Sequence, residues 1–189
     1  MPTSRIYDIV DGKLAWTEVD LLDICGSSAS PLRNVLEEFG IQVNLRPIGQ
    51  SRHVLAALGG AFPIAPFVIV SCHGEDGQIL LPELGGSIAE AQPFHDSMGP
   101  AQIRDHLRIP GSTVISTGCE TGRAALAAAF LDAGANGYFA PADAPEGHSA
   151  FFAVLTLFYE LTAGRELRDA VNRVKGYDDE LSMWEYWTR

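Results

Sequence analysis

At 189 residues the chain is long enough for one domain with a full hydrophobic core, and it contains no disordered or low-complexity block. A formal net charge of −11, with no basic stretch to offset it, argues against nucleic acid and anionic membranes as partners. Three cysteines without metal-type spacing predict neither a disulfide framework nor a zinc site, so we expect reduced thiols in a cytoplasm. The first residues lead into no apolar segment of a secretory signal, and we expect no metal and no cofactor.

The predicted elements begin with a β-ribbon over residues 1–16, where apolar residues flank the turn signal Asp11-Gly12. Strands and helices then alternate, because β-branched apolar runs are followed by helical patterns. Strands are expected at residues 19–25 and 41–46, in the runs that begin at 67 and 113, and at 138–140. Helices are expected at residues 31–40, 50–58, 100–107, 121–133, 149–163 and 166–174. Residues 78–81 are interpreted as a β-arm and residues 85–99 as a surface loop.

This order of elements predicts the fold class. Strands that alternate with helices form right-handed βαβ units, which build a largely parallel sheet with helices on both faces. We therefore expect one domain over residues 1–189, an α/β fold built as a three-layer α/β/α sandwich. The strand at 41–46 alternates apolar and polar residues, which is typical of a strand near the edge of a sheet.

Two of the predicted strands end at residues that can do chemistry. The run that begins at Phe67 stops at His73 and Gly74, and the run that begins at Thr113 stops near Cys119. Both runs are rich in β-branched apolar residues, which indicates strands buried on both faces of a parallel sheet. Open α/β sheets bind their ligands at the carboxyl ends of such strands. A histidine and a cysteine at the same edge are the components of a thiolate nucleophile.

The position of Cys119 distinguishes it from the other two cysteines. It stands between Gly118 and residues 120–122, where we expect the strand to turn into a helix whose positive end favours the thiolate. A cysteine is otherwise more often a small core residue, and this is our interpretation of Cys25 and Cys72. The remaining histidines are interpreted as surface residues without metal-ligand spacing: His53, His95, His106 and His148.

The order of the two residues along the chain narrows the class of nucleophile. His73 precedes Cys119 by 46 residues. In α/β-hydrolases and papain-like enzymes the nucleophile comes first, whereas in the caspase-type arrangement the histidine lies about 50 residues upstream of the cysteine. The spacing therefore favours the caspase-type arrangement.

Several segments resemble the caspase-like cysteine peptidases, and within them the CHAT domains. Residues 68–74 are similar to the family's strand that ends in His-Gly. Residues 114–122 resemble its Ser-Ala-Cys-Glu-Thr-Gly signature, although Thr117-Gly118 stands where Ser-Ala is usual. Two further similar segments are residues 127–135 and 158–171. The similarity covers roughly residues 66–175, while the first sixty or so residues carry only the generic fold.

The resemblance implies a cysteine endopeptidase with a His73–Cys119 dyad. Cys119 would attack the peptide carbonyl to form an acyl-enzyme, with the N–H groups of Gly74 and Cys119 as the oxyanion hole. Related enzymes select P1, the residue before the scissile bond, by a charge in the S1 pocket. Asp143 or Glu146 would supply that charge for a basic P1 residue. Equally, Asp143 shapes a turn and Glu146 lies near the start of the next helix, and the tryptophan usual in this segment is absent.

Two other functions stay open. In the first, the domain is catalytically silent and serves as a protein-interaction module. CHAT domains commonly adjoin helical repeats, which this chain lacks, so a regulatory protein would be a separate partner or a second copy in a homodimer. The aromatic residues 183–187 either cover such a partner surface or pack on the domain's own core. The second is a flavodoxin-like small-molecule binder, but no glycine-rich phosphate loop supports it.

Overall fold

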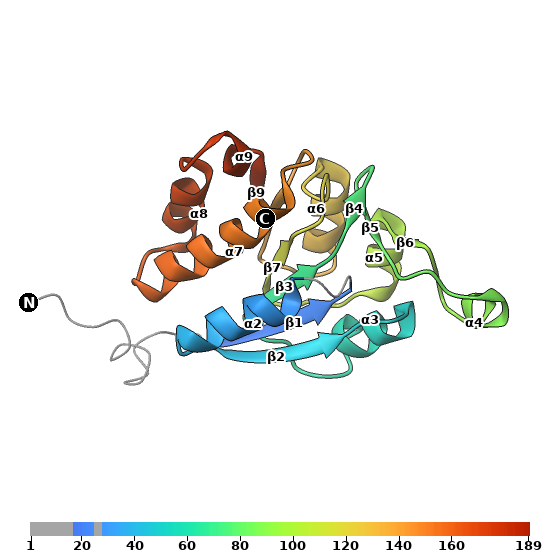
Figure 1. Cartoon of the computed structure of the whole chain (residues 1–189). Coiled ribbons are helices and arrows are strands. Elements are labelled where there is room, and N and C mark those ends of the chain that lie inside the picture. Colours follow the sequence, from blue (N-terminus) through green and yellow to red (C-terminus); the bar gives the residue numbers. More distant parts are fainter. Residues whose placement is uncertain (1–16, 25–27) are drawn as a thin grey trace, which may run out of the picture.

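The computed structural model describes residues 17–24 and 28–189 as helices packed around a central sheet (Figure 1). The expected β-ribbon over residues 1–16 and the interpretation of Cys25 as a core residue lie outside the described residues.

The central sheet has six strands in the order β2-β1-β3-β7-β8-β9. Neighbouring strands from β2 to β8 run parallel, and β9 runs antiparallel to β8. The strands are β1 (Glu18–Asp23), β2 (Gln42–Pro47), β3 (Phe67–Ser71), β7 (Thr113–Ser116), β8 (Gly137–Pro141) and β9 (Trp184–Thr188). The expected, mainly parallel sheet is therefore confirmed, and β2 lies at its edge as the alternating pattern predicts.

Helices cover both faces of this sheet. They are α2 (Ala29–Glu38), α3 (Ser51–Leu58), α5 (Pro100–His106), α6 (Ala124–Asp132), α7 (Gly147–Thr162), α8 (Leu167–Lys175) and α9 (Asp179–Ser182). One core cluster takes its helical residues from α3, α5 and α6, and the other from α2, α7, α8 and α9. The three-layer sandwich is thus the observed architecture. Within the described part of the chain, no helix is both long and apolar enough to cross a membrane.

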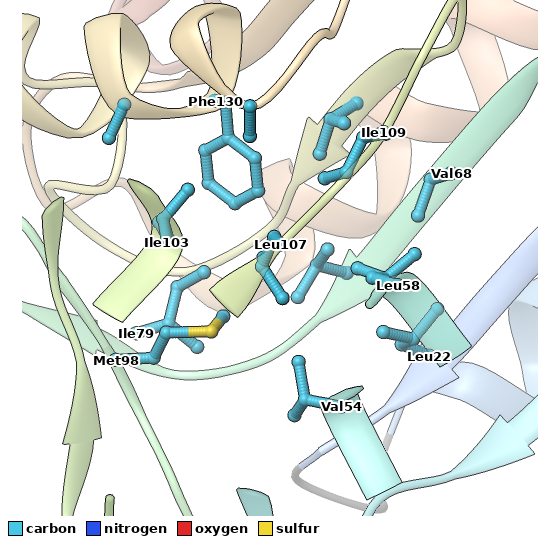
Figure 2. Packing of buried hydrophobic residues seen from close by; sticks show 14 of the residues in the cluster. Leu22, Val54, Leu58, Val68, Ile79, Met98, Ile103, Leu107, Ile109 and Phe130 are labelled. Atoms are coloured by element: carbon cyan, nitrogen blue, oxygen red, sulfur yellow. The ribbon is translucent and has the colours of Figure 1, made fainter. Parts of the chain in front are cut away.

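The central strand β3 shows why the apolar runs form buried strands. Val68 and Val70 point into the first cluster, where Leu58 of α3 and Phe130 of α6 also lie (Figure 2), whereas Ile69 belongs to the second cluster. Successive side chains of a strand point to opposite faces, so a strand between two helical layers is apolar at every position. Full burial of one such side chain stabilises the fold by about 1.5–3 kcal/mol.

A small antiparallel sheet follows β3 and confirms the expected β-arm. Its strands are β4 (Gly74–Glu75), β5 (Gln78–Leu80) and β6 (Ser97–Met98). Between β4 and β5, Asp76 has φ 49° and Gly77 has φ 72°. Positive φ at both central residues is what a tight two-residue hairpin turn requires, and the Asp-Gly pair adopts it readily.

The prediction that residues 85–99 form a loop throughout was wrong in part. This segment contains the helix α4 (Gly86–Glu90) and the strand β6. β6 forms because Met98 and Ser97 pair with β5 and Met98 is buried in the first core cluster. Such short elements are produced by tertiary pairing, because they are too short to show a period in the sequence.

The aromatic C-terminal segment packs on the domain itself. Trp184 is fully buried, with its ring centroid 4.8 Å from that of Phe139 on the neighbouring strand β8. The indole N–H of Trp187 donates a hydrogen bond of 3.1 Å to the carbonyl oxygen of Gly122. Of the two alternatives drawn from the sequence, the structure supports packing on the domain's own core.

Candidate active site

The two chemically able segments meet at one edge of the sheet. β3 and β7 are parallel neighbours, with Val70 paired to Ser116, so the chain leaves both strands on the same side. His73 and Cys119 follow these strands and line the same pocket, whose volume is about 440 Å³. The predicted adjacency of the two strands is confirmed, and it brings the imidazole-bearing and thiol-bearing turns together.

Two glycines allow these turns to touch through their backbones. A Cβ on Gly74 would lie only 2.3 Å from the carbonyl oxygen of Cys119, and a Cβ on Gly118 only 2.9 Å from the backbone nitrogen of Gly74. Side chains never approach backbone so closely, so both positions require the missing Cβ of glycine. The chain segments 73–74 and 118–119 are therefore in direct contact.

The pairing of β4 with β5 fixes the direction of the Gly74 N–H group. The N–H of Leu80 donates a 3.0 Å hydrogen bond to the carbonyl oxygen of His73, and Gly74 stands opposite Ile79. Hydrogen-bonded and non-hydrogen-bonded pairs alternate in an antiparallel ladder, so Gly74 occupies a non-hydrogen-bonded position. Its N–H therefore points away from β5, toward the side where Gly118 lies.

The turn that carries Cys119 is held by hydrogen bonds to the segment after β8. The N–H of Glu120 donates to the carbonyl oxygen of Asp143 at 2.8 Å, and the N–H of Gly122 donates to that of Pro141 at 2.7 Å. Within the turn, the Thr121 hydroxyl donates to the carbonyl oxygen of Gly118 at 2.7 Å. The backbone of Glu120 has φ 58°, in the left-handed region that non-glycine residues seldom adopt.

The same turn corrects the predicted start of the helix after Cys119. We expected the helix from residue 121, but α6 begins at Ala124. The left-handed Glu120 and the bonds from residues 120 and 122 to the segment after β8 use the backbone groups that a longer helix would need. The positive end of α6 therefore does not begin beside the thiol, contrary to our interpretation of the sequence.

A buried polar cluster lies beneath the two turns. The N–H of Cys72 donates to the Thr117 hydroxyl at 3.1 Å, and the Cys72 Sγ lies 3.4 Å from the Ser116 hydroxyl. The Tyr138 hydroxyl donates to the carbonyl oxygen of Thr121 at 2.9 Å, and burial raises the pKa of this phenol well above its usual value. Tyr138 therefore stays protonated and serves as a permanent donor to the Cys119 turn. Cys72 is buried, in keeping with its interpretation as a core residue, although it also reaches the pocket wall.

The two predicted substrate-binding carboxylates lie beside the pocket. Asp143 and Glu146 are both exposed, and the residues that line the pocket do not include either of them. The Asp143 carboxylate accepts a 2.9 Å bond from the N–H of Ala144, while Glu146 directly precedes α7. Pro145 between them does line the pocket, and its carbonyl oxygen lies 4.0 Å from the Cys119 Sγ. The role of the two carboxylates in substrate binding stays a prediction.

Two residues at the site were missed in the sequence. His148, interpreted as a surface residue, lies in the first turn of α7 and lines the pocket with Cys119. Asp23 ends β1 opposite Ser71 of β3, and it lines a second pocket of about 640 Å³ together with His73. Asp23 carried a usable signal, because it is a carboxylate at the carboxyl end of a predicted core strand.

The comparisons with known proteins bear on the fold. No protein-family model and no curated protein matches the chain. Among solved structures, the Arg-specific cysteine proteinase gingipain R superposes with a TM-score of 0.58 at 10% sequence identity, covering 92% of this chain and 46% of that one. The complex of the pro- and mature domains of RgpB from Porphyromonas gingivalis gives a TM-score of 0.57 at 12% identity, covering 92% and 47%.

The chain thus spans less than half the length of either protein. At such low identity the similarity shows the fold alone, and that fold is the caspase-like α/β sandwich expected from the sequence. The finer assignment to the CHAT type stays a prediction.

Proposed function

We propose that this domain is a cysteine endopeptidase that works through Cys119 and His73. The observation that carries the proposal is that both residues line one pocket at the carboxyl edge of two adjacent parallel strands. The caspase-like fold shared with a cysteine proteinase supports it. A nucleophile and a base on contacting turns are the minimal components of acyl transfer.

In the proposed reaction, His73 accepts the thiol proton and the Cys119 sulfur attacks the carbonyl carbon of the scissile peptide bond. The tetrahedral intermediate collapses to a thioester, and His73 donates the proton to the departing amine. Water then attacks the thioester with His73 as the base, which releases the carboxylic acid and restores the thiol. No external oxidant or cofactor enters these steps.

The oxyanion is stabilised in this proposal by the N–H groups of Gly74 and Cys119. The N–H of Gly74 points away from β5, toward the Cys119 turn, so it is available to the negative oxygen of the intermediate. We assign Asp23 a positioning role, since it lies with His73 at the lining of the second pocket and its carboxylate would orient the imidazole.

The proposed substrate is a peptide or protein. A basic P1 residue would require Asp143 or Glu146 to reach the substrate from outside the pocket lining, and this remains one outcome for a substrate screen to decide. Control by a separate regulatory protein or by a homodimer, and location in a cytoplasm, are further proposals that rest on the sequence alone.

The test compares thiol reactivity and cleavage in the same protein. We expect iodoacetamide to alkylate Cys119 at least tenfold faster than the buried Cys72, measured by peptide mass spectrometry. His73→Ala should slow this labelling at least tenfold, and Asp23→Asn should slow it less. A library of fluorogenic tetrapeptides should be cleaved by the wild type and not by Cys119→Ala.

The outcomes separate the candidate functions. Slow labelling of Cys119 that does not depend on His73, together with no cleavage, would refute the dyad and leave the protein-interaction module. Fast, His73-dependent labelling without cleavage would support the dyad and indicate an enzyme that needs an activator.

A further inference from the structure

The pocket beside Cys119 is an open end of one hydrophobic core layer. Leu32 of α2, which belongs to the second core cluster, lines it, as do Ala150 and Phe151 of α7, which pack against that cluster. Pro145 adds a further apolar wall on the side of the Cys119 sulfur. A side chain that enters this pocket therefore leaves water and meets mainly carbon.

The polar groups at the pocket carry no negative charge. They are the hydroxyls of Ser28 and Thr117 and the imidazoles of His73 and His148. No carboxylate is found among the described residues that line it.

The acidic residues near the pocket are engaged elsewhere. Glu120, next to the nucleophile, pairs with Arg123 and accepts a 2.7 Å bond from the N–H of Asp76. The Asp143 carboxylate accepts the N–H of Ala144 in its own loop.

Both helices at the pocket begin there. Ser28 directly precedes α2, and Gly147 and His148 form the start of α7, and all three line the pocket. The positive ends of two helix dipoles therefore face the space, which disfavours a cationic side chain. The same ends favour an anion, but a carboxylate pressed against Leu32 and Phe151 would lose its hydration, and no arginine or lysine lines the pocket to compensate.

We propose that this pocket is an S1 site for an uncharged apolar P1 side chain of the leucine, methionine or phenylalanine type. This inference deepens the proposed peptidase function and rests on it. Phe151 and Leu32 are the specificity-determining residues, and they hold the P1 side chain while its carbonyl carbon lies at the Cys119 sulfur. The volume of about 440 Å³ lies within the range of small-ligand pockets.

Matched covalent probes test this preference even if turnover needs an activator. Peptidyl chloromethyl ketones that differ only at P1 (leucine, phenylalanine, arginine or aspartate) alkylate a thiol at a rate that depends on how well P1 is seated. We expect Cys119 in the full chain to react at least tenfold faster with the leucine and phenylalanine probes than with the arginine and aspartate probes. Faster labelling by arginine, faster labelling by aspartate, or equal labelling by all four would overturn the inference.

A charge-insertion variant locates the determinant. Phe151→Glu places a carboxylate in the pocket wall and should raise the ratio of arginine to leucine labelling at least tenfold. The matched control is Phe152→Glu, the next residue of α7, which is exposed and lines a different groove, so its ratio should stay unchanged. If Phe151→Glu does not fold, Phe151→Ala serves instead and should lower the rate with the phenylalanine probe at least fivefold relative to arginine. An unchanged ratio in a folded variant would contradict the assignment.

Iodoacetamide separates this inference from the function on which it rests. If Cys119 reacts with iodoacetamide no faster than an ordinary thiol and no probe labels it, the peptidase proposal fails and the S1 assignment fails with it. If iodoacetamide labels Cys119 rapidly and His73→Ala abolishes this, but the four probes do not differ, the dyad stands and only the apolar S1 assignment is refuted.

Discussion

Gly74 is the residue that most tightly constrains the candidate site. A Cβ at this position would lie 2.3 Å from the carbonyl oxygen of Cys119 and 2.5 Å from the Cγ2 of Thr121. The carbonyl belongs to the backbone of a turn held by several hydrogen bonds, so it cannot move aside on its own. Any side chain at Gly74 therefore pushes the two turns apart.

We predict that Gly74→Ala lowers kcat/KM on a cleaved peptide by about 100-fold, because a displacement of about 1 Å at a reacting centre has that effect. The overpacked turn should also lower the free energy of unfolding by about 1–3 kcal/mol, measured by urea denaturation. Gly85→Ala is the control, since a Cβ there meets nothing within 4 Å. Wild-type kinetics in a folded Gly74→Ala protein would argue against contact between the two turns.

At the level of elements, Glu160 joins α7 to the turn and helix that follow it. Its buried carboxylate pairs with Arg165 in the turn and with Arg173 of α8, the latter at 3.1 Å. Burial alone would raise the pKa of Glu160, but the hydrogen bonds and charges of the two arginines outweigh it and lower the pKa. A carboxyl whose pKa is lower in the folded state stabilises the fold when ionised, and this contribution is lost as the pH falls through the folded pKa.

We predict that Glu160→Gln lowers the free energy of unfolding at pH 7 by about 1–2 kcal/mol, between the values of exposed and buried ion pairs. The difference from wild type should shrink as the pH falls below about 4, where Glu160 becomes protonated. Urea denaturation at several pH values measures both effects. In the control Glu37→Gln, which breaks an exposed pair with Arg33, we expect a change below about 0.5 kcal/mol. A difference that persists undiminished at pH 3 would contradict the ionic explanation.

The elements that the sequence predicted well are those whose signal is local. The apolar runs of β3 and β7 and the helix α7 follow from side-chain period and length. The start of α6 was predicted three residues early, because the bonds from the Cys119 turn to the segment after β8 replace helical bonds and join residues distant in sequence. β6 was missed for a similar reason, since only its pairing with β5 makes it a strand.

The candidate site shows the same division at the scale of the whole molecule. His73 and Cys119 could be picked out because each ends a strong strand pattern, and the neighbouring positions of β3 and β7 then bring them to one pocket. His148 could not, because its place at the pocket depends on where α7 begins relative to α2. The apolar character of the pocket likewise arises only when two helices from opposite ends of the chain share one core cluster.

The last strand braces the whole arrangement. β9 pairs with β8 along its length, and the carbonyl oxygen of Met183 accepts a 2.8 Å bond from the N–H of Ala142, in the segment that leads to the pocket. Trp187 of this strand also donates to the carbonyl of Gly122 in the Cys119 turn. Trp184 anchors the strand, because it is one of the largest fully buried side chains and packs on Phe139.

We predict that Trp184→Ala lowers the free energy of unfolding by about 3–5 kcal/mol, a large share of the 5–15 kcal/mol typical of a domain. Trp184→Phe should cost distinctly less, because the indole N–H has no hydrogen-bond partner among the described residues and the ring contact is kept. Urea denaturation of both variants checks the order. If β9 braces the pocket, Trp184→Ala should also slow alkylation of Cys119 under conditions where the protein remains folded, whereas equal labelling in both variants would show that the site is held without the strand.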